Sequence, residues 1–188
     1  MTVIALIGMP GSGKSSVGRQ LARRLSWAFA DADAEVERQI GCSIRAYFEQ
    51  HGEAAFRDVE QSVLASLLER DRTIVATGGG AVLREANRRL LASRAEVVYL
   101  RSTPEELMRR LRHDTHRPLL QVSDPMRKLR ELFEQRDRLY RECAHFVIET
   151  GRPSVKLLCG MILMQLELAG LVDPSEAPSP LLRDRGDG

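Results

Sequence analysis

GMPGSGKSS, residues 8–16, is the most informative stretch of this amino-acid sequence. It matches the pattern G-x-x-x-x-G-K-[ST], whose glycines let backbone N–H groups converge on phosphate oxygens. The apolar run VIALI at 3–7 leads into it, and a helical pattern over 14–25 follows it. A helix that begins at such a loop adds the positive end of its dipole to the anion site. The sequence therefore predicts a phosphate-binding P-loop between a strand and a helix.

Two polar side chains of the loop have expected roles. In P-loop proteins the lysine ammonium reaches the β- and γ-phosphates of the nucleotide, and the next hydroxyl coordinates Mg²⁺. Lys14 and Ser15 hold these positions, although the chain has 25 arginines and only three lysines. An ammonium is more compact than a guanidinium fork, so a lysine here indicates a chemical requirement. We expect Lys14 to take part in catalysis and Ser15 to bind Mg²⁺ directly.

Length and composition indicate one ordinary globular domain. The chain has 188 residues, of which 43% are hydrophobic and 29% are charged. The formal net charge is +2, from 28 basic and 26 acidic residues, so the charge balance gives no global field for a nucleic acid or an anionic membrane. We therefore expect neither as a partner, and a small-molecule enzyme suits this balance better.

Cysteine content and apolar runs bear on the compartment. The odd number and wide spacing of Cys42, Cys143 and Cys159, without a CxxC pair, predict neither a disulfide framework nor a zinc site. Apolar runs long enough to cross a membrane, about 18 residues, do not occur. The N-terminal MTVIALIG also lacks the features of a signal peptide. The sequence thus favours a protein of the reducing cytoplasm.

Short apolar runs alternate with longer helical patterns over residues 1–172, which we interpret as one domain. The expected strands are 3–7, 28–31, 73–76, 96–100 and 145–148. The expected helices are 14–25, 59–70, 85–92, 104–110, 125–140 and 154–168. Strands separated by helices predict an α/β fold whose parallel sheet, of about five strands, is covered by helices on both faces.

Four segments add detail to this alternation. A helical insertion, 34–57, is longer than one crossover needs, and the polar, basic stretch 112–124 is typical of a lid. The apolar segment 161–171 is expected to be a core helix. The Pro-, Ser- and Asp-containing end, 173–188, is expected to be a disordered tail.

Two acids stand at the end of the second expected strand. Asp31 and Asp33 lie at the carboxyl end of 28–31, the edge at which open α/β sheets bind ligands, and alternate side chains point the same way. Asp31 could organise Mg²⁺, directly or through water, and Asp33 could accept a proton or hydrogen bond from a substrate hydroxyl. Alternatively, one of the acids caps a helix that begins near Ala34.

The third expected strand ends without an acid. Thr77 and three glycines, 78–80, follow strand 73–76 instead, so no Mg²⁺ ligand is available at this strand end. Backbone amides without side chains can approach an anion or a hydroxyl closely. The alternative interpretation is a tight turn into the helix that begins near Arg84.

These motifs, taken in order, resemble shikimate kinase over about residues 1–168. The set comprises the P-loop, Asp31-Ala32-Asp33, Phe56-Arg57 before a helix, Thr77-Gly78-Gly79-Gly80, Arg117-Pro118-Leu119-Leu120, and Arg136 with Tyr140 four residues later. The resemblance implies a P-loop NTPase of the nucleoside-monophosphate-kinase type with a five-stranded parallel sheet. The insertion 34–57 would bind substrate, and 112–124 would be the lid. It also implies transfer of the γ-phosphoryl of Mg-ATP to the 3-hydroxyl of shikimate.

The resemblance also implies roles for individual residues. Those expected to contact ATP are Gly11, Ser12, Gly13, Lys14, Ser15, Ser16, Arg117 and Arg152. Those expected to contact shikimate are Asp33, Arg57, Gly79, Gly80 and Arg136. Lys14, Asp33 and Arg117 would be catalytic. The chemistry agrees, because a planar guanidinium can donate two parallel hydrogen bonds to a carboxylate, as Arg57 and Arg136 would to shikimate.

Two alternatives remain open from the sequence. A related small-molecule kinase, such as a gluconate kinase, would share the P-loop and the size, but it gives no reason for the pair Arg57 and Arg136 or for the three glycines. A non-catalytic nucleotide-binding sensor of a metabolite would be expected to lack Lys14, Ser15, Asp33 or Arg117, and all four are present. We expect the protein to act as a monomer.

Overall fold

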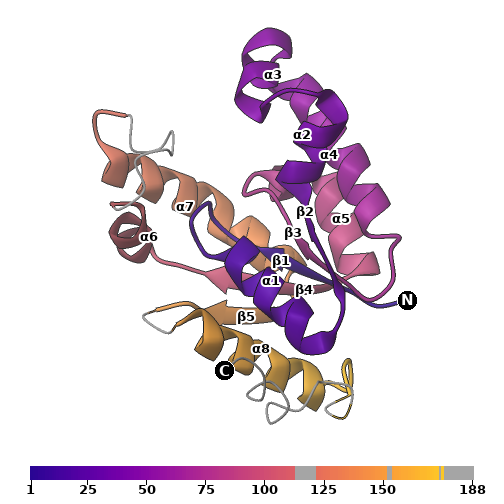
Figure 1. The fold of residues 1–188 in the computed structure, drawn as a ribbon. Coiled ribbons are helices and arrows are strands. Elements are labelled where there is room, and N and C mark those ends of the chain that lie inside the picture. Colours follow the sequence, from indigo (N-terminus) through magenta and orange to yellow (C-terminus); the bar gives the residue numbers. More distant parts are fainter. Residues whose placement is uncertain (113–121, 152–153, 174, 176–188) are drawn as a thin grey trace, which may run out of the picture.

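The computed structural model describes residues 1–112, 122–151, 154–173 and 175. Within them, five parallel strands form one sheet in the order β2-β3-β1-β4-β5 (Figure 1). The strands are β1 (Val3–Ile7), β2 (Ala28–Asp31), β3 (Thr73–Ala76), β4 (Glu96–Arg101) and β5 (Phe146–Glu149). The α/β class and the five-stranded parallel sheet predicted from the sequence are thus confirmed.

Helices cover both faces of the sheet (Figure 1). They are α1 (Lys14–Leu25), α2 (Ala32–Ile40), α3 (Ile44–His51), α4 (Glu53–Leu67), α5 (Glu85–Arg94), α6 (Pro104–Leu111), α7 (Pro125–Cys143) and α8 (Val155–Leu168), with a short 3-10 turn η1 (Ala81–Leu83). Alternate strand residues point to opposite faces, so Ile4 and Leu6 pack with α1 and α8. Ala5 and Ile7 pack on the other face, in the core that includes residues of α4 and α7.

Strands β1 and β3 contain no charged side chain, because helices bury them on both faces. Every residue of β1 and of β3 is buried, as is typical of strands inside a parallel sheet. The helix start predicted after β4 also forms, since Thr103 accepts a hydrogen bond from the Glu106 N–H while the Glu106 side chain accepts one from the Thr103 N–H. Because β2, β3 and β1 are parallel neighbours, their carboxyl ends lie at the same edge of the sheet.

The insertion between β2 and β3 is helical, as expected, but its boundaries differ. It begins with α2 at Ala32, and its last helix, α4, begins at Glu53 and runs on to Leu67. Arg57 therefore lies inside a helix rather than before one. Gly52 divides α3 from α4, because its positive φ of 85° interrupts the helical path. In Figure 1, α3 stands at the end of the molecule farthest from α8.

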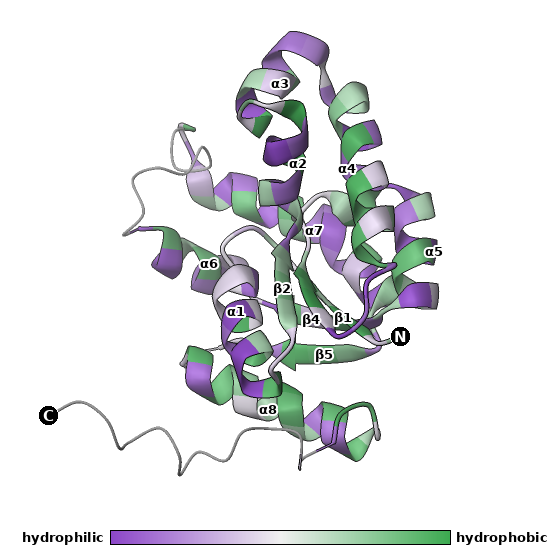
Figure 2. Ribbon diagram, turned by 45° about the vertical axis from the view of Figure 1, so that its right-hand side comes forward, coloured by the Kyte–Doolittle hydropathy of each residue, from purple (hydrophilic) through white to green (hydrophobic). Residues whose placement is uncertain are grey.

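The expectation of a core helix at 161–171 holds for one side of α8 only. Ile162 and Leu166 are buried against the sheet. On the outer side Met164 is 60% exposed and Leu168 is 79% exposed, which gives the helix an apolar outer stripe (Figure 2). In the described part of the chain, no helix combines the length and the hydropathy that crossing a membrane requires.

Candidate active site

The P-loop joins β1 to α1 through glycines in conformations that other residues rarely adopt. Gly8, Gly11 and Gly13 have φ values of 152°, 84° and 95°. A Cβ on Gly8 would lie 2.6 Å from the Leu100 carbonyl oxygen, so the loop also needs a small residue for space. No side chain caps the start of α1, so the first N–H groups of this helix remain available to an anion held in the loop. The strand, loop and helix predicted for a P-loop are therefore present, with the backbone conformation that its glycines allow.

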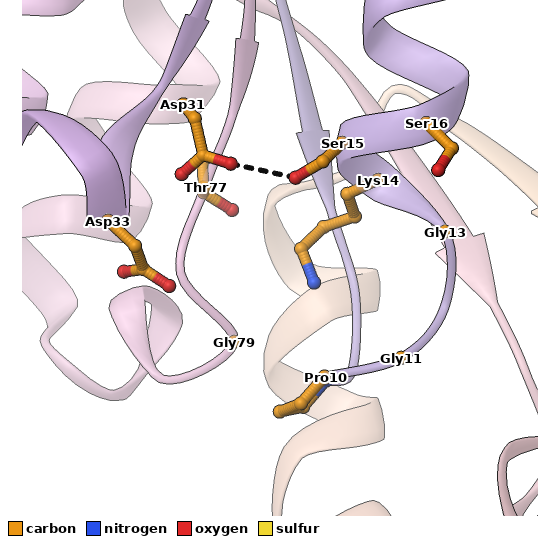
Figure 3. A pocket seen from close by; sticks show the side chains of 10 residues that line it. All are labelled: Pro10, Gly11, Gly13, Lys14, Ser15, Ser16, Asp31, Asp33, Thr77 and Gly79. Carbon is orange, nitrogen blue, oxygen red and sulfur yellow. Dashed lines mark hydrogen bonds between the residues drawn. The ribbon is translucent and has the colours of Figure 1, made fainter. Parts of the chain in front are cut away.

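Beside this loop lies a cavity of about 490 Å³. Its lining includes most of the predicted ATP and metal residues and two of those predicted for substrate: Gly11, Gly13, Lys14, Ser15, Ser16, Asp31, Asp33 and Gly79, together with Pro10 and Thr77 (Figure 3). Ser12 does not line it, because its side chain is buried and its N–H bonds back to the Met9 carbonyl oxygen at 3.1 Å.

Lys14 extends into the space enclosed by the loop (Figure 3). Its ammonium donates hydrogen bonds to the carbonyl oxygens of Gly8 at 2.8 Å and Met9 at 3.0 Å. The side chain is only 9% exposed, so the charge is held beside loop carbonyls rather than in open water. A compact ammonium at this position can exchange a carbonyl for a phosphate oxygen with little movement.

Ser15 and Asp31 meet as the sequence predicts. The Ser15 hydroxyl donates to one Asp31 carboxylate oxygen at 2.8 Å, and the other oxygen accepts from the Ala34 N–H at 3.2 Å (Figure 3). Asp31 therefore caps α2, as one interpretation of this acid predicted, and it also faces the P-loop through Ser15. A hydroxyl beside a carboxylate is an oxygen donor pair of the kind Mg²⁺ prefers. Among the described residues no cluster of three or more His, Cys, Asp or Glu side chains could hold a metal, so phosphate and water would have to supply the other ligands.

Asp33 reaches the same cavity by a route that the strand pattern did not predict. Strand β2 ends at Asp31, and Asp33 belongs to the first turn of α2, so the expectation that the two acids alternate along one strand is wrong. Burial raises the pKa of Asp33 to about 6, helped by the nearby carboxylates of Glu60 and Asp31 and opposed by Lys14. A carboxylate so tuned can accept a proton near neutral pH.

Three parts of the site meet at the glycines 78–80, which we call the glycine loop. A Cβ on Gly78 would lie 2.7 Å from an Asp33 carboxylate oxygen and 2.8 Å from one of Glu60. A Cβ on Gly79 would lie 2.7 Å from Pro10 of the P-loop, and one on Gly80 would collide with the Arg57 guanidinium. The glycines thus serve close packing as well as an open backbone.

Arg57 is held in place by two acids of its own helix. Its guanidinium bonds to Glu60 at 2.8 Å and lies 3.5 Å from Glu53. Glu60 is only 3% exposed, and its pairing with Arg57 keeps this buried carboxylate satisfied. The sequence analysis missed Glu60, although its place three residues after Arg57 on a helix would have suggested the ion pair.

Arg136 lies on α7, one turn before the buried Tyr140. The Tyr140 hydroxyl donates to the Gly79 carbonyl oxygen at 2.6 Å. Burial raises the pKa of Tyr140 to about 12, and the charges of Arg136 and Arg57 oppose this rise. Both arginines therefore act on one phenol, although they are far apart in the sequence. They adjoin the cavity through the glycine loop rather than lining it.

Arg110 of α6 is a further contact that the sequence analysis did not identify. Its guanidinium donates to the Ser12 carbonyl oxygen at 3.1 Å and to the Ser102 hydroxyl at 3.2 Å. It thereby holds the back of the P-loop, a role that only the position of α6 in space reveals. Arg117, Arg152 and most of the expected lid, 112–124, and tail, 173–188, lie outside the described residues.

Comparisons with known proteins agree with this geometry. The family model for shikimate kinase matches residues 10–167. A shikimate kinase of Burkholderia pseudomallei is 55% identical over 169 residues, covering 90% of this chain and 92% of the relative. The solved shikimate kinase of Acinetobacter baumannii, in complex with shikimate, is 44% identical with a TM-score of 0.84, covering 92% of this chain and 96% of that one.

A gluconokinase structure from Sinorhizobium meliloti, at 17% identity and a TM-score of 0.54, shares the fold alone. The family model and the close relatives, by contrast, cover nearly the whole P-loop domain, including the two acids, the glycine loop and both arginine positions. The chain therefore belongs to the shikimate kinase family.

Proposed function

We propose that the chain transfers the γ-phosphoryl group of ATP to the 3-hydroxyl of shikimate, giving ADP and shikimate 3-phosphate. The observation that carries this proposal is the arrangement around the glycine loop. A half-buried acid, Asp33, and a fixed guanidinium, Arg57, flank glycines that pack against the P-loop. A hydroxyl-bearing carboxylic acid needs such a set: an acceptor for one hydroxyl and guanidinium groups for the carboxylate.

The nucleotide would bind along the P-loop. Backbone N–H groups of Gly11, Gly13 and the start of α1 support binding of its phosphates, and Lys14 would turn from loop carbonyls to phosphate oxygens. Arg117, in the expected lid, would stabilise charge on the transferred group, and Arg152 would contact the adenine side. These two assignments come from the resemblance alone.

The acceptor would bind between α2, the glycine loop and α7. Arg57 and Arg136 would hold the carboxylate, the glycine loop would contact the ring through its backbone, and Asp33 would accept the hydrogen bond of the reacting hydroxyl. Because phosphoryl transfer has a loose transition state, Asp33 would orient that hydroxyl more than it removes its proton. Positioning is therefore the larger part of its role.

Magnesium fits the oxygen donors at the loop. The Ser15 hydroxyl would bind the ion directly, and Asp31 would hold it through that hydroxyl or through water. When bound, Mg²⁺ neutralises charge on the phosphates. The chain's own contribution is to hold Ser15 and Asp31 at the mouth of the P-loop, where phosphates and water complete the coordination.

We further infer that the enzyme works as a monomer in the cytoplasm, in the pathway that leads through chorismate to aromatic amino acids. Its three cysteines are free thiols, which suits a reducing compartment. Sedimentation or light scattering would test the monomer.

Release of ADP in a coupled assay with Mg-ATP tests the function. We expect turnover that depends on shikimate and stays at background with gluconate. Mass spectrometry of the product would identify shikimate 3-phosphate. Activity with gluconate instead would favour the related-kinase alternative, and nucleotide binding without turnover on either acid would favour a non-catalytic sensor.

A further inference from the structure

Tyr140 is buried in α7, and the phosphoryl transfer described above gives it no role. Its hydroxyl donates a hydrogen bond of 2.6 Å to the carbonyl oxygen of Gly79, a residue 61 positions away in the sequence. Because burial raises the pKa of this phenol to about 12, the hydroxyl remains protonated at any pH at which the enzyme would work. The Gly79 carbonyl oxygen therefore keeps its hydrogen-bond donor, the Tyr140 hydroxyl, throughout this pH range.

The same hydroxyl interacts with Arg136. Residues four apart on a helix lie on one face, and the positive charge of Arg136 opposes the raised pKa of Tyr140, so the guanidinium lies near this hydroxyl. A guanidinium only donates, whereas a phenol both donates and accepts. The Tyr140 oxygen can thus accept from Arg136 while its proton goes to Gly79, which joins two of the groups proposed to bind substrate.

Packing fixes the position of this hydroxyl. The rings of Tyr140 and Tyr99 lie 4.8 Å apart between centroids with a tilt of 30°. The Tyr99 hydroxyl donates to Asp137 at 2.7 Å, and Asp137 also accepts from Arg101 at 3.1 Å. The Tyr140 ring therefore rests on a network that ties β4 to α7, and its hydroxyl has little freedom to move away from the glycine loop.

The glycine loop needs such an anchor. Three successive glycines have more backbone freedom than any other tripeptide, and these provide no side chains to fix them. Gly79 lies close to Pro10 of the P-loop, and its carbonyl oxygen accepts the hydrogen bond from Tyr140 of α7. Since a trans peptide is planar, fixing the Gly79 carbonyl also fixes the direction of the Gly80 N–H.

We propose that Tyr140 is a positioning residue whose hydroxyl joins Arg136 to the Gly79 carbonyl, so that the carboxylate-binding guanidinium and the glycine loop meet the substrate in one arrangement. The inference rests on the proposed function, because it concerns the acceptor side of the same site. The P-loop backbone and Lys14 lie outside this link. The effect of Tyr140 should therefore fall on the acceptor and not on ATP.

The variant Tyr140→Phe tests the link by removing one oxygen atom and keeping the ring. We expect KM for shikimate to rise about tenfold, the effect of one lost hydrogen bond, with KM for ATP within about twofold of the original value. Thr73→Val is the matched control, since it removes a buried hydroxyl that also donates to a backbone carbonyl, that of Asp71 at 2.9 Å, at the end of β3 opposite the site. Its KM for shikimate should stay unchanged even where its unfolding temperature falls.

A double-mutant cycle with Arg136→Ala distinguishes positioning from general stability. If Tyr140 acts through Arg136, Tyr140→Phe should raise KM for shikimate clearly less in the Arg136→Ala background than in the original enzyme. Equal effects in both backgrounds, or an unchanged KM in Tyr140→Phe, would overturn the proposal. Equal losses of affinity for ATP and shikimate would overturn it too. An original enzyme without shikimate-dependent activity would instead refute the proposed function itself.

Discussion

The chemical properties of single residues in this site depend strongly on the groups around them. Asp33 shows this best, because an ordinary aspartate becomes a group with a pKa of about 6 through burial and the nearby charges of Glu60 and Asp31. If its ionised form accepts the hydrogen bond of the shikimate hydroxyl, kcat/KM for shikimate should fall as the pH drops below about 6. A pH profile measured with saturating ATP checks this, and a flat profile down to pH 5 would contradict it.

The same raised pKa has a consequence for stability. The folded-state pKa of Asp33 lies above the unfolded value of 3.8, so its contribution to stability is largest below pH 3.8 and is lost as the pH rises through about 6. Asparagine resembles the protonated form. Asp33→Asn should therefore be more stable by about 1–3 kcal/mol at pH 8, though nearly inactive. Urea unfolding at pH 8 measures this, with the exposed Asp58→Asn as a control that should gain nothing.

Lys14 provides a test of size at constant charge. Its ammonium donates to the loop carbonyls of Gly8 and Met9, and a guanidinium is a larger, planar group with a different donor geometry. Lys14→Arg should reduce kcat about 100-fold or more, as loss of an electrostatic donor to the transition state does. Lys128→Arg, the same change at an exposed position of α7, should keep full activity. Turnover of Lys14→Arg close to that of this control would show that charge alone suffices.

The glycine loop is the element on which the acceptor side of the site depends. In Gly78→Ala the new methyl group would press on the carboxylates of Asp33 and Glu60, and both are closely packed. We expect a loss of shikimate-dependent activity of at least about tenfold, since small misplacements at a reacting centre have large effects on rate. Gly160→Ala, in the middle of α8, meets nothing nearer than 3.9 Å. This control should be fully active and slightly more stable, which steady-state kinetics and thermal unfolding would show.

The elements were predictable where burial leaves a clear pattern. Strands β1 and β3 are buried on both faces, so they appear in the sequence as short runs that are apolar except for Thr73, and the P-loop has its own signature. The start of α4 was missed because Glu53–Arg57 has a weak apolar pattern and no side-chain cap. Asp33 was assigned to a strand because the helix begins directly at the strand's end. Glu60, Arg110 and the bond from Tyr140 to Gly79 depend on packing between distant segments, which one sequence does not display.

At the level of the whole molecule, the two halves of the site belong to different parts of the fold. The P-loop depends on β1, α1 and the back contact from α6. The acceptor side depends on α2, α4, α7 and the glycine loop between them. Arg57 and Arg136 come from helices that are separated by two strands in the sequence, and the parallel sheet brings them together at one edge. The two ligands should therefore be separable by mutation.

Arg136→Ala tests this separation. Leaving the shikimate carboxylate without one guanidinium costs a few kcal/mol, so KM for shikimate should rise strongly, about 30-fold or more. A ligand stabilises the folded state by an amount that grows with the ratio of its concentration to its Kd, so the thermal shift produced by shikimate at a concentration near the original Kd should disappear, while the shift produced by Mg-ATP remains. Arg130→Ala, on the same helix as Arg136, loses only an exposed ion pair with Glu105 of α6 and should keep both shifts. If Arg136→Ala lost both shifts, nucleotide binding at the P-loop would also depend on Arg136 of α7. The acceptor and nucleotide sites would then not be separable by mutation.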